Sequence, residues 1–231
     1  MKCVILQPSY IPWRGFFDQI FRADTFVFYD DVQYDKHGWR NRNRVKTANG
    51  PAWLTIPVRS QGNVIQHTPI HEIAIDWSRD WTKKHLRTLE QAYAKAPFYA
   101  RYEGLLRNRL AKHPEKLADL TIDLTIALAQ ELGLESRRFL RASQMGIAGS
   151  RTARLVAMLR QLGATHYISG PSAKAYLEED KLSAAGITLE YMEYRYPEYP
   201  QLYPPFDPQV SILDLLFMTG PEAPQYIWGA T

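Results

Sequence analysis

Apolar runs and an amphipathic stretch alternate over the first 31 residues. Residues 2–6 ("KCVIL") form a short apolar, β-rich run, which is typical of a buried strand. Residues 16–23 carry apolar side chains at helical spacing, and residues 24–31 form a second apolar run that ends in two carboxylates. Strand, loop, helix and strand make a βαβ unit, which is normally right-handed with parallel strands.

The pattern becomes helical between residues 80 and 132. An apolar stripe at i, i+4 spacing is formed by Trp81, His85, Leu89 and Tyr93. Pro97 and Pro114 divide this region into about three helices, and Gly133 is a plausible C-terminal stop. We therefore expect a helical subregion over residues 80–135.

Further strands and helices flank this subregion. Residues 52–58 and 71–75 have the composition of strands, and the turn between them contains "SQGN". Strands are also predicted within 165–170 and 186–194, and a Pro/Tyr-rich loop over 195–208. These elements predict an α/β fold with a parallel, Rossmann-like sheet, organised as one domain over residues 1–231.

Two more helices have recognisable ends. The first spans residues 150–163, with Ser150 as a candidate cap and Gly163 at its end. The second follows Ser211, and Asp214 is placed to complete a capping pair with it. Both helices carry an apolar face, so we expect them to pack on the sheet.

Composition and charge narrow the class of protein. The chain is 45% hydrophobic and carries a net charge of +4, which suits a small anionic ligand. A nucleic-acid-binding protein would show a dense basic stripe, which is missing here. The one cysteine excludes a disulfide framework, and no stretch has the length of a signal peptide or a membrane span. We expect a cytoplasmic protein.

The first candidate site is the loop "QPSYIPWRG" after the opening strand. In open α/β sheets the ligand crevice lies beyond the carboxyl ends of the strands, and a helix N-terminus there attracts anions. Gln7, Tyr10 and Trp13 could orient a polar ligand, Arg14 could supply charge, and Gly15 could let a ligand approach the backbone. The structural alternative is a rigid turn with buried aromatic side chains.

The second candidate lies at the end of the next strand. Asp30 and Asp31 point to opposite faces if the strand continues, so one of them could act as a general base. Gln33 follows as a candidate ligand contact. The alternatives are a divalent metal ion, for which two adjacent Asp residues are a weak signal, and a salt bridge to the arginines that follow.

The third candidate is "WRNRNRVK". If this segment is extended, its cations share one face, where arginine forks suit phosphate or carboxylate, and its other residues share the opposite face. The cations are Arg40, Arg42, Arg44 and Lys46. The opposite face has Trp39, Asn41, Asn43 and Val45. The structural alternative is an edge strand protected from aggregation by charge.

A fourth candidate follows a later strand. Ser169, Gly170 and Ser172 lie where a strand ends and a helix begins, although ordinary capping explains them as well. His85 is retained as a catalytic candidate, while its position on an apolar stripe is more typical of an interior histidine. No metal ligand set is predicted, because His67 and His71 lack the spacing of a helical pair.

Several segments together resemble the WbqC-like family of bacteria, in order from about residue 4 to 220. They are "QPSYIPWRGFFDQI", "ADTFVFYDDVQY", "WRNRNRVKT", "WLTIPV", "YISGPSAKAYL", "YPQ" and "SILDLL". The resemblance implies a role in O-antigen and other surface-polysaccharide (lipopolysaccharide) biosynthesis. It also implies a transferase that forms an amide by moving an aminoacyl or acyl group to an amino-sugar nucleotide.

A more distant likeness concerns the first βαβ unit, which looks like adenylate-forming ligases and nucleotidylyltransferases with a HIGH motif. Both histidines of that motif are missing, and "PWRGFF" stands in their place. Arg14, Arg42 or Arg44 would then have to stabilise the phosphates.

These observations lead to one hypothesis with two rivals. In the transferase, the four cations of the third candidate hold a diphosphate and Trp13 and Trp39 pack against the base or sugar. One of the two adjacent Asp residues deprotonates the amine, and Gln7 and Tyr10 orient the acyl donor. The rivals are an ATP-dependent ligase or nucleotidylyltransferase, and a non-catalytic module that binds a sugar nucleotide or a partner. ATP with Mg²⁺ and an acyl-thioester donor both remain open as cofactors, and a homodimer remains open as the assembly.

Overall fold

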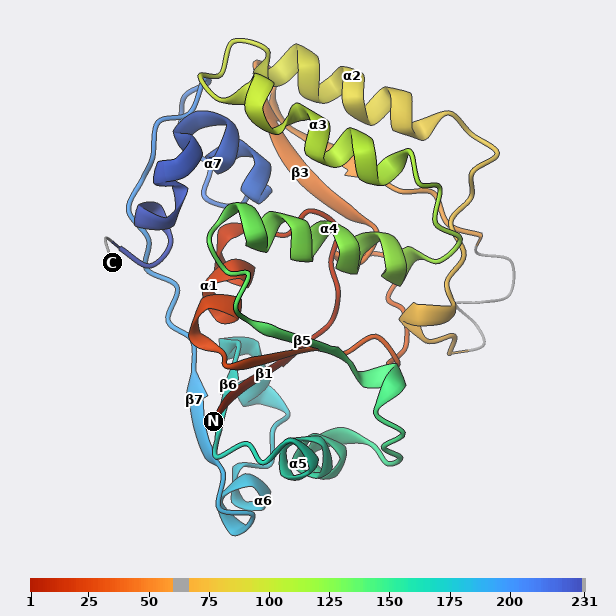
Figure 1. Cartoon of the computed structure of the whole chain (residues 1–231), viewed down its shortest axis with the longest axis vertical. Coiled ribbons are helices and arrows are strands. Elements are labelled where there is room, and N and C mark those ends of the chain that lie inside the picture. Colours follow the sequence, from red (N-terminus) through yellow and green to blue (C-terminus); the bar gives the residue numbers. More distant parts are fainter. Residues whose placement is uncertain (60–66, 230–231) are drawn as a thin grey trace.

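The computed structural model of the chain describes residues 1–59 and 67–229. Its centre is a parallel sheet of five strands in the order β5-β2-β1-β6-β7 (Figure 1). The strands are β1 (Lys2–Leu6), β2 (Thr25–Phe28), β5 (Arg138–Arg141), β6 (His166–Ser169) and β7 (Thr188–Tyr191). The expected α/β, Rossmann-like sheet is therefore confirmed.

Helices cover both faces of this sheet (Figure 1). Helices α1 (Arg14–Arg22), α4 (Leu117–Glu131) and α7 (Ile212–Thr219) share one hydrophobic cluster. Helices α5 (Arg151–Leu162) and α6 (Glu179–Ala184) belong to the other. In β1, Val4 joins the first cluster while Cys3 and Ile5 join the second, because side chains alternate along a strand.

The helical subregion begins with α2 (Trp81–Tyr93) and α3 (Tyr99–Leu110) and ends with α4. The predicted division at the two prolines is confirmed, and Gly133 follows the last helix with φ 77°. Under α2 and α3 lies an antiparallel hairpin of β3 (Arg42–Thr47) and β4 (Gly50–Thr55) (Figure 1). The Tyr93 hydroxyl accepts a hydrogen bond from the Lys46 backbone N–H at 2.8 Å, which ties α2 to this hairpin.

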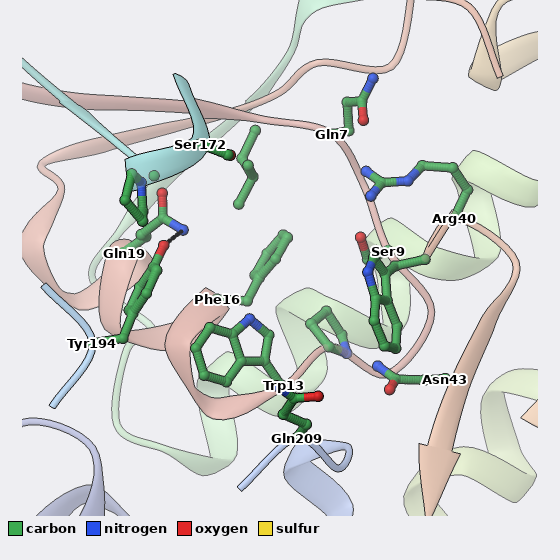
Figure 2. Close-up of a pocket in the computed structure, with 15 residues that line it drawn as sticks. Gln7, Ser9, Trp13, Phe16, Gln19, Arg40, Asn43, Ser172, Tyr194 and Gln209 are labelled. Carbon is green, nitrogen blue, oxygen red and sulfur yellow. Dashed lines mark hydrogen bonds between the residues drawn. The ribbon is translucent and has the colours of Figure 1, made fainter. Parts of the chain in front are cut away.

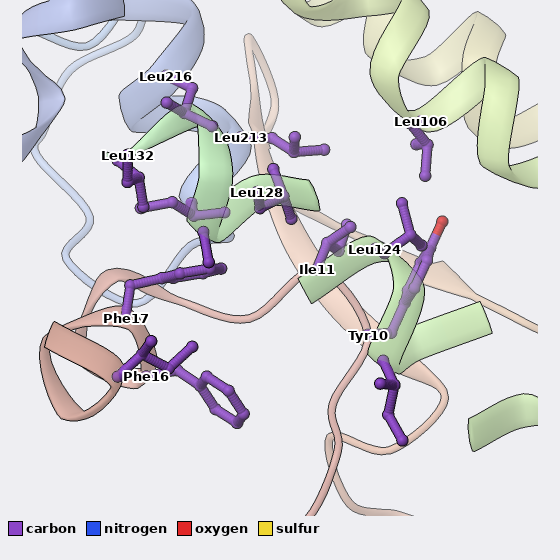
Figure 3. Packing of buried hydrophobic residues seen from close by; sticks show 14 of the residues in the cluster. Tyr10, Ile11, Phe16, Phe17, Leu106, Leu124, Leu128, Leu132, Leu213 and Leu216 are labelled. Carbon is purple, nitrogen blue, oxygen red and sulfur yellow. The ribbon is translucent and has the colours of Figure 1, made fainter. Parts of the chain in front are cut away.

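The first cluster is packed from segments far apart in the chain. Figure 3 shows Phe16 and Phe17 of α1 near Leu128 of α4 and Leu132, which follows that helix, with Leu216 of α7 beyond them. Each such side chain contributes roughly 1.5–3 kcal/mol when it is fully buried. This packing holds α1, and therefore the loop before it, against the sheet.

Several local predictions need correction. Residues 71–75, predicted as a strand, begin in the 3-10 turn η1 (Ile70–Glu72) and continue with two isolated bridges, Val58–Ile75 and Ala74–Lys116. Ile70 and Ile73 are buried at i, i+3 spacing, which a turn satisfies and a strand does not. The "SQGN" turn lies outside the described residues.

Helix capping also differs from the prediction. Ser211 caps α7 through its hydroxyl, which accepts from the Leu213 N–H at 3.2 Å. Asp214 does not complete the pair, because its carboxylate accepts hydrogen bonds from Tyr93 and Gln201. Ser150 occupies the cap position of α5 but makes no side-chain capping bond.

The remaining short elements are 3-10 turns: η2 (Ala142–Gln144), η3 (Pro171–Ala175) and η4 (Gly220–Tyr226). Residues 195–208 form the expected irregular loop. Within the two described ranges, no helix combines the length and the apolar character needed to span a bilayer.

Candidate functional site

A pocket of about 460 Å³ opens at the carboxyl ends of β1 and β6. Counted along the chain, the five sheet strands have the order 3-2-1-4-5, so the strand order reverses between β1 and β6. The loops after these two strands separate there, which leaves a crevice in which doubly wound sheets bind ligands. Gln7 and Ser9 line the pocket from the β1 side, and Gly170 and Ser172 from the β6 side.

Other segments complete the wall (Figure 2). They come from the end of β1, the loop before α1 and the first turns of α1, from the start of β3 and the residues before it, from the segment after β6, and from the C-terminal part of the chain. The further lining residues are Leu6, Pro12, Trp13, Phe16, Gln19, Trp39, Arg40, Asn43, Pro171, Tyr194 and Gln209.

Arg40 gives the pocket its positive charge. Its side chain is 11% exposed, and its Nε lies 3.4 Å from Asp35 Oδ1 without making a hydrogen bond. Burial lowers the pKa of the guanidinium, and nearby Asp35 only partly opposes this effect. A buried cation with an incomplete set of partners gains from an anion, and its planar fork suits a phosphate.

The opposite end of the pocket is neutral. Gln19 of α1 donates from Nε2 to the Tyr194 hydroxyl at 3.0 Å, and Figure 2 shows this pair across the pocket from Arg40. Tyr194 lies edge-on to Trp13, with ring centroids 4.9 Å apart. The two ends therefore offer different chemistry, a guanidinium at one and an amide with a phenol at the other.

Gly15 allows Trp13 to form part of this wall. A Cβ atom at position 15 would lie 2.3 Å from Cζ2 of the Trp13 ring, closer than carbon atoms can approach. Glycine therefore permits the indole to lie over the first turn of α1. The sequence indicated a need for glycine here, and the group that approaches its backbone is this indole.

Comparison with known proteins identifies one family that matches nearly the entire chain. Residues 7–226 match the WbqC-like protein family, a span that includes every pocket residue except Leu6. The chain belongs to the WbqC-like protein family. It is also 42% identical over 228 residues to the uncharacterized protein Rv1507c of Mycobacterium tuberculosis, covering 98% of this chain and 97% of that protein. No solved structure matches it.

Seven of the predicted site residues of this WbqC-like chain meet in the pocket. They are Gln7, Trp13, Trp39, Arg40, Asn43, Gly170 and Ser172. They come from three of the four segments singled out in the sequence, which a parallel sheet brings to one edge. Asn43 also donates to the carbonyls of Tyr10 and Ile11, so it fixes the loop after β1.

The two adjacent carboxylates are outside the pocket lining. Asp30 has no exposed surface and accepts hydrogen bonds from Arg141 at 2.7 Å and from the N–H and hydroxyl of Ser143. Asp31 is paired with Arg154 of α5. The strand does not continue to them, because β2 ends at Phe28 and both residues lie in the turn that follows. Their partners lie far along the chain rather than in the arginine row. Both serve to connect β2 to its neighbours.

The cations after Arg40 have separate partners. Arg42 lies over the Trp53 ring, with its guanidinium 4.5 Å from the centroid, and Arg44 donates to Gln209. Lys46 is buried, and its ammonium donates to Gln201 and to the Pro205 carbonyl. The structure does not bring the four cations together on one ligand-binding face.

Asn41 lies on the inner side of the same segment. It is buried and donates to the Ile56 carbonyl at 2.8 Å. Together with buried Asn43 and Val45, it shows the alternation expected of an extended segment. Trp39 departs from this pattern, because it is 43% exposed and packs against Trp53 with ring centroids 5.4 Å apart.

Tyr10 and His85 form a buried pair in the core. His85 Nε2 donates to the Thr55 carbonyl at 3.2 Å, so its Nδ1 must accept from the Tyr10 hydroxyl at 3.0 Å. Burial lowers the pKa of His85 to about 4 and raises that of Tyr10. Neither residue lines the pocket, and His85 has the environment of the interior histidine that its stripe indicated.

The remaining predicted residues are also structural. Arg14 is buried, donates to the carbonyls of Pro197 and Tyr226, and lies 4.8 Å from the Tyr196 centroid. Ser169 is the buried last residue of β6. Exposed Gln33 shares a hydrogen bond of 2.8 Å with the ring of His67.

Sequence patterns missed several lining residues, above all Ser9, Phe16, Gln19, Tyr194 and Gln209. Gln19 carried a usable signal, since it is an amide three positions after Phe16 on the buried side of α1. Tyr194 and Gln209 lie in irregular segments, where no periodicity shows which side chain faces inward.

Proposed function

We propose that this WbqC-like protein binds an anionic amino-sugar nucleotide in the β1–β6 pocket and transfers an acyl group to its amine. The observation that carries the proposal is the largely buried, incompletely partnered Arg40 guanidinium at a switch-point crevice with aromatic walls. The diphosphate would lie against Arg40. The family resemblance supports surface-polysaccharide biosynthesis as the setting.

The pocket supports transfer by orientation of the two reactants. In this reaction the amine nitrogen attacks the carbonyl carbon of an acyl thioester, the C–S bond breaks, and the thiol leaves with the amine proton. Amide and hydroxyl groups of Gln7, Ser9 and Ser172 can hold donor and acceptor in position. Asp30 and Asp31 receive no role as the base, because both are held in ion pairs outside the lining.

One observation favours a second candidate, a module that binds the nucleotide without chemistry. None of the described residues that line the pocket is an Asp, Glu, His or Cys. The two proposals differ in turnover. Release of free thiol from an acyl thioester, dependent on the amino sugar, supports the transferase, and tight binding without release supports the module.

Both candidates require that the pocket binds an amino-sugar nucleotide, and calorimetric titration with UDP- and TDP-amino sugars tests this claim. We expect Arg40→Gln to weaken binding at least tenfold, since a charge-assisted contact to phosphate contributes about 1.5–3 kcal/mol. Arg109→Gln is the matched control, because Arg109 on α3 is also partly buried, has an unbonded Nε and lies 4.0 Å from a carboxylate. Equal affinity in wild type and Arg40→Gln would contradict the proposal. Pyrophosphate release from ATP and Mg²⁺ would instead support the ligase.

A further inference from the structure

The neutral end of the pocket contains a buried polar atom without a partner. Gln19 is 3% exposed, and its Oε1 accepts no hydrogen bond within the described parts of the chain. Its Nε2 is already used, donating to Tyr194. Buried acceptors are almost always paired in folded proteins, and Gln19 is one of the residues that line the pocket. Its unpaired Oε1 therefore indicates a donor brought by a ligand that displaces the atoms now covering it.

Tyr194 offers the complementary group next to it. Its hydroxyl accepts from Gln19, so its own proton remains to be donated. Burial raises the pKa of Tyr194 to about 12, which keeps that proton in place at neutral pH. A Cβ on Gly170 would lie 3.4 Å from this hydroxyl, so the phenol is close to the loop after β6. An acceptor and a donor thus lie side by side.

The surroundings of this pair favour a flat ring. Trp13 and Phe16 line the pocket between the Gln19 end and the Arg40 end (Figure 2). Gln19 Oε1 repels phosphate and carboxylate oxygens, which carry lone pairs but no proton at neutral pH. An anion is therefore directed to Arg40, and a neutral planar group to Gln19.

We infer that Gln19 and Tyr194 recognise the nucleobase of the nucleotide, through an N–H group and a neighbouring acceptor on the base edge. The N–H donates to Gln19 Oε1, the acceptor receives the Tyr194 proton, and the aromatic side chains stack on the ring. This inference rests on the proposed function, because it assigns the end of the ligand opposite the diphosphate held by Arg40.

Titration of the intact protein with UDP, TDP, ADP and inorganic pyrophosphate tests this assignment. The variants are Gln19→Met, which keeps the side-chain volume, and Tyr194→Phe, which keeps the ring. We expect each variant to bind the tightest-binding nucleoside diphosphate about tenfold more weakly, or worse, than wild type does. Each variant leaves one hydrogen-bonding group of the base unpaired. Pyrophosphate lacks a base, so its affinity should not change.

Tyr196→Phe is the matched control. Tyr196 belongs to the same segment, packs edge-on near Trp13, and donates its hydroxyl to Asp18 of α1 at 2.8 Å, but it does not line the pocket. We expect its nucleotide affinity to equal that of wild type. Thermal unfolding of all variants identifies any loss of fold, and Tyr194→Phe remains informative if Gln19→Met is unstable.

The outcomes separate the two claims. Nucleotide binding that depends on Arg40 but not on Gln19 or Tyr194 overturns the base assignment alone. If Gln19→Met and Tyr194→Phe lose affinity for UDP-sugars but keep their affinity for UDP, the base assignment is also overturned. The Gln19 end of the pocket would then hold the sugar. Absence of nucleotide binding in wild type, or binding insensitive to Arg40→Gln, overturns the proposed function and this inference together.

Discussion

Asp30 shows how a residue at the position of a catalytic base can serve the fold instead. Its carboxylate is fully buried, and Arg141 and Ser143 surround it at the end of β5. A buried carboxylate with an ion-pair partner, a hydroxyl donor and a backbone donor ties the turn after β2 firmly to the end of β5. The residue types in "YDD" are compatible with either role, and only the position of Arg141 decides between them.

Asp30→Asn tests this structural role. We expect a loss of roughly 3 kcal/mol in the free energy of unfolding, because one partner of a buried pair is removed. Arg141 keeps its contact with Asp119, which limits the cost. Urea denaturation measures the effect, with Asp123→Asn as the control at an exposed ion pair, where the cost stays below about 1 kcal/mol. An unchanged midpoint for Asp30→Asn would contradict this role.

His85 makes stability depend on pH. Its folded pKa of about 4 lies below the unfolded value of 6.5, so between these values the unfolded chain binds more protons. The contribution is complete above pH 6.5 and is lost as the pH falls toward 4. We expect wild type to lose about 2–3 kcal/mol more than His85→Gln between pH 7 and 4.5, measured by urea denaturation. Parallel pH profiles for the two proteins would disprove this prediction.

At the element scale, local patterns predicted those segments whose own residues determine their conformation. β1, α1 and β2 follow from apolar spacing, and Pro97 and Pro114 set the helix boundaries. β5 was not predicted, because Phe139 and Leu140 stand between two arginines and only the neighbouring β2 makes them a strand. The prediction for residues 71–75 was wrong for the opposite reason. Their composition is strand-like, but within the described residues they pair only through isolated bridges to Val58 and Lys116.

The junction between the β1 loop and α1 depends on Gly15. Alanine in a helix normally stabilises it by about 0.5–1 kcal/mol relative to glycine, but Gly15→Ala pushes the Trp13 indole away. We expect at least a tenfold loss of nucleotide affinity and a changed tryptophan fluorescence spectrum. Gly104→Ala in α3 is the control, since its Cβ would meet nothing closer than 3.9 Å. Retained affinity in Gly15→Ala would show that the Trp13 position is unimportant.

At the scale of the whole molecule, a buried polar network joins segments that lie far apart in the sequence. Asp214 of α7 accepts from the Tyr93 hydroxyl at 2.7 Å and from Gln201 at 2.9 Å, and Gln201 accepts from Lys46. Burial raises the pKa of Asp214, and its hydrogen bonds oppose that rise. This network explains why Lys46, which sequence alone assigned to the ligand, is directed inward.

Removing one member of this network should weaken the fold and leave the ligand site intact. We expect Tyr93→Phe to cost about 1–3 kcal/mol, because the buried Asp214 carboxylate loses a donor. Tyr99→Phe is the control, since Tyr99 also packs on Phe217 but its hydroxyl makes no hydrogen bond within the described residues. Chemical denaturation gives the stability and titration with UDP gives the affinity. A Tyr93→Phe midpoint equal to that of the control would argue against the network.

The sequence could predict those residues of the candidate site whose position follows from the order of the strands in the sheet. The carboxyl ends of parallel strands share one edge, so Gln7 and Gly170 could be expected to meet. Gln19, Tyr194 and Gln209 reach the pocket through packing between distant segments, and no local pattern records that packing. The alternation around Arg40 was correct, but the assumption that all four cations face one ligand was not supported by their partners.

The pocket wall starts at Leu6 and ends at Gln209, so a bound ligand would hold together nearly the full length of the chain. Ligand that binds only the folded state adds to its stability by mass action, about 2.7 kcal/mol at one hundred times its dissociation constant. Proteases in a cell act on the opened chain, so occupied molecules would be degraded more slowly than empty ones. The lifetime of this protein would then follow the supply of its ligand.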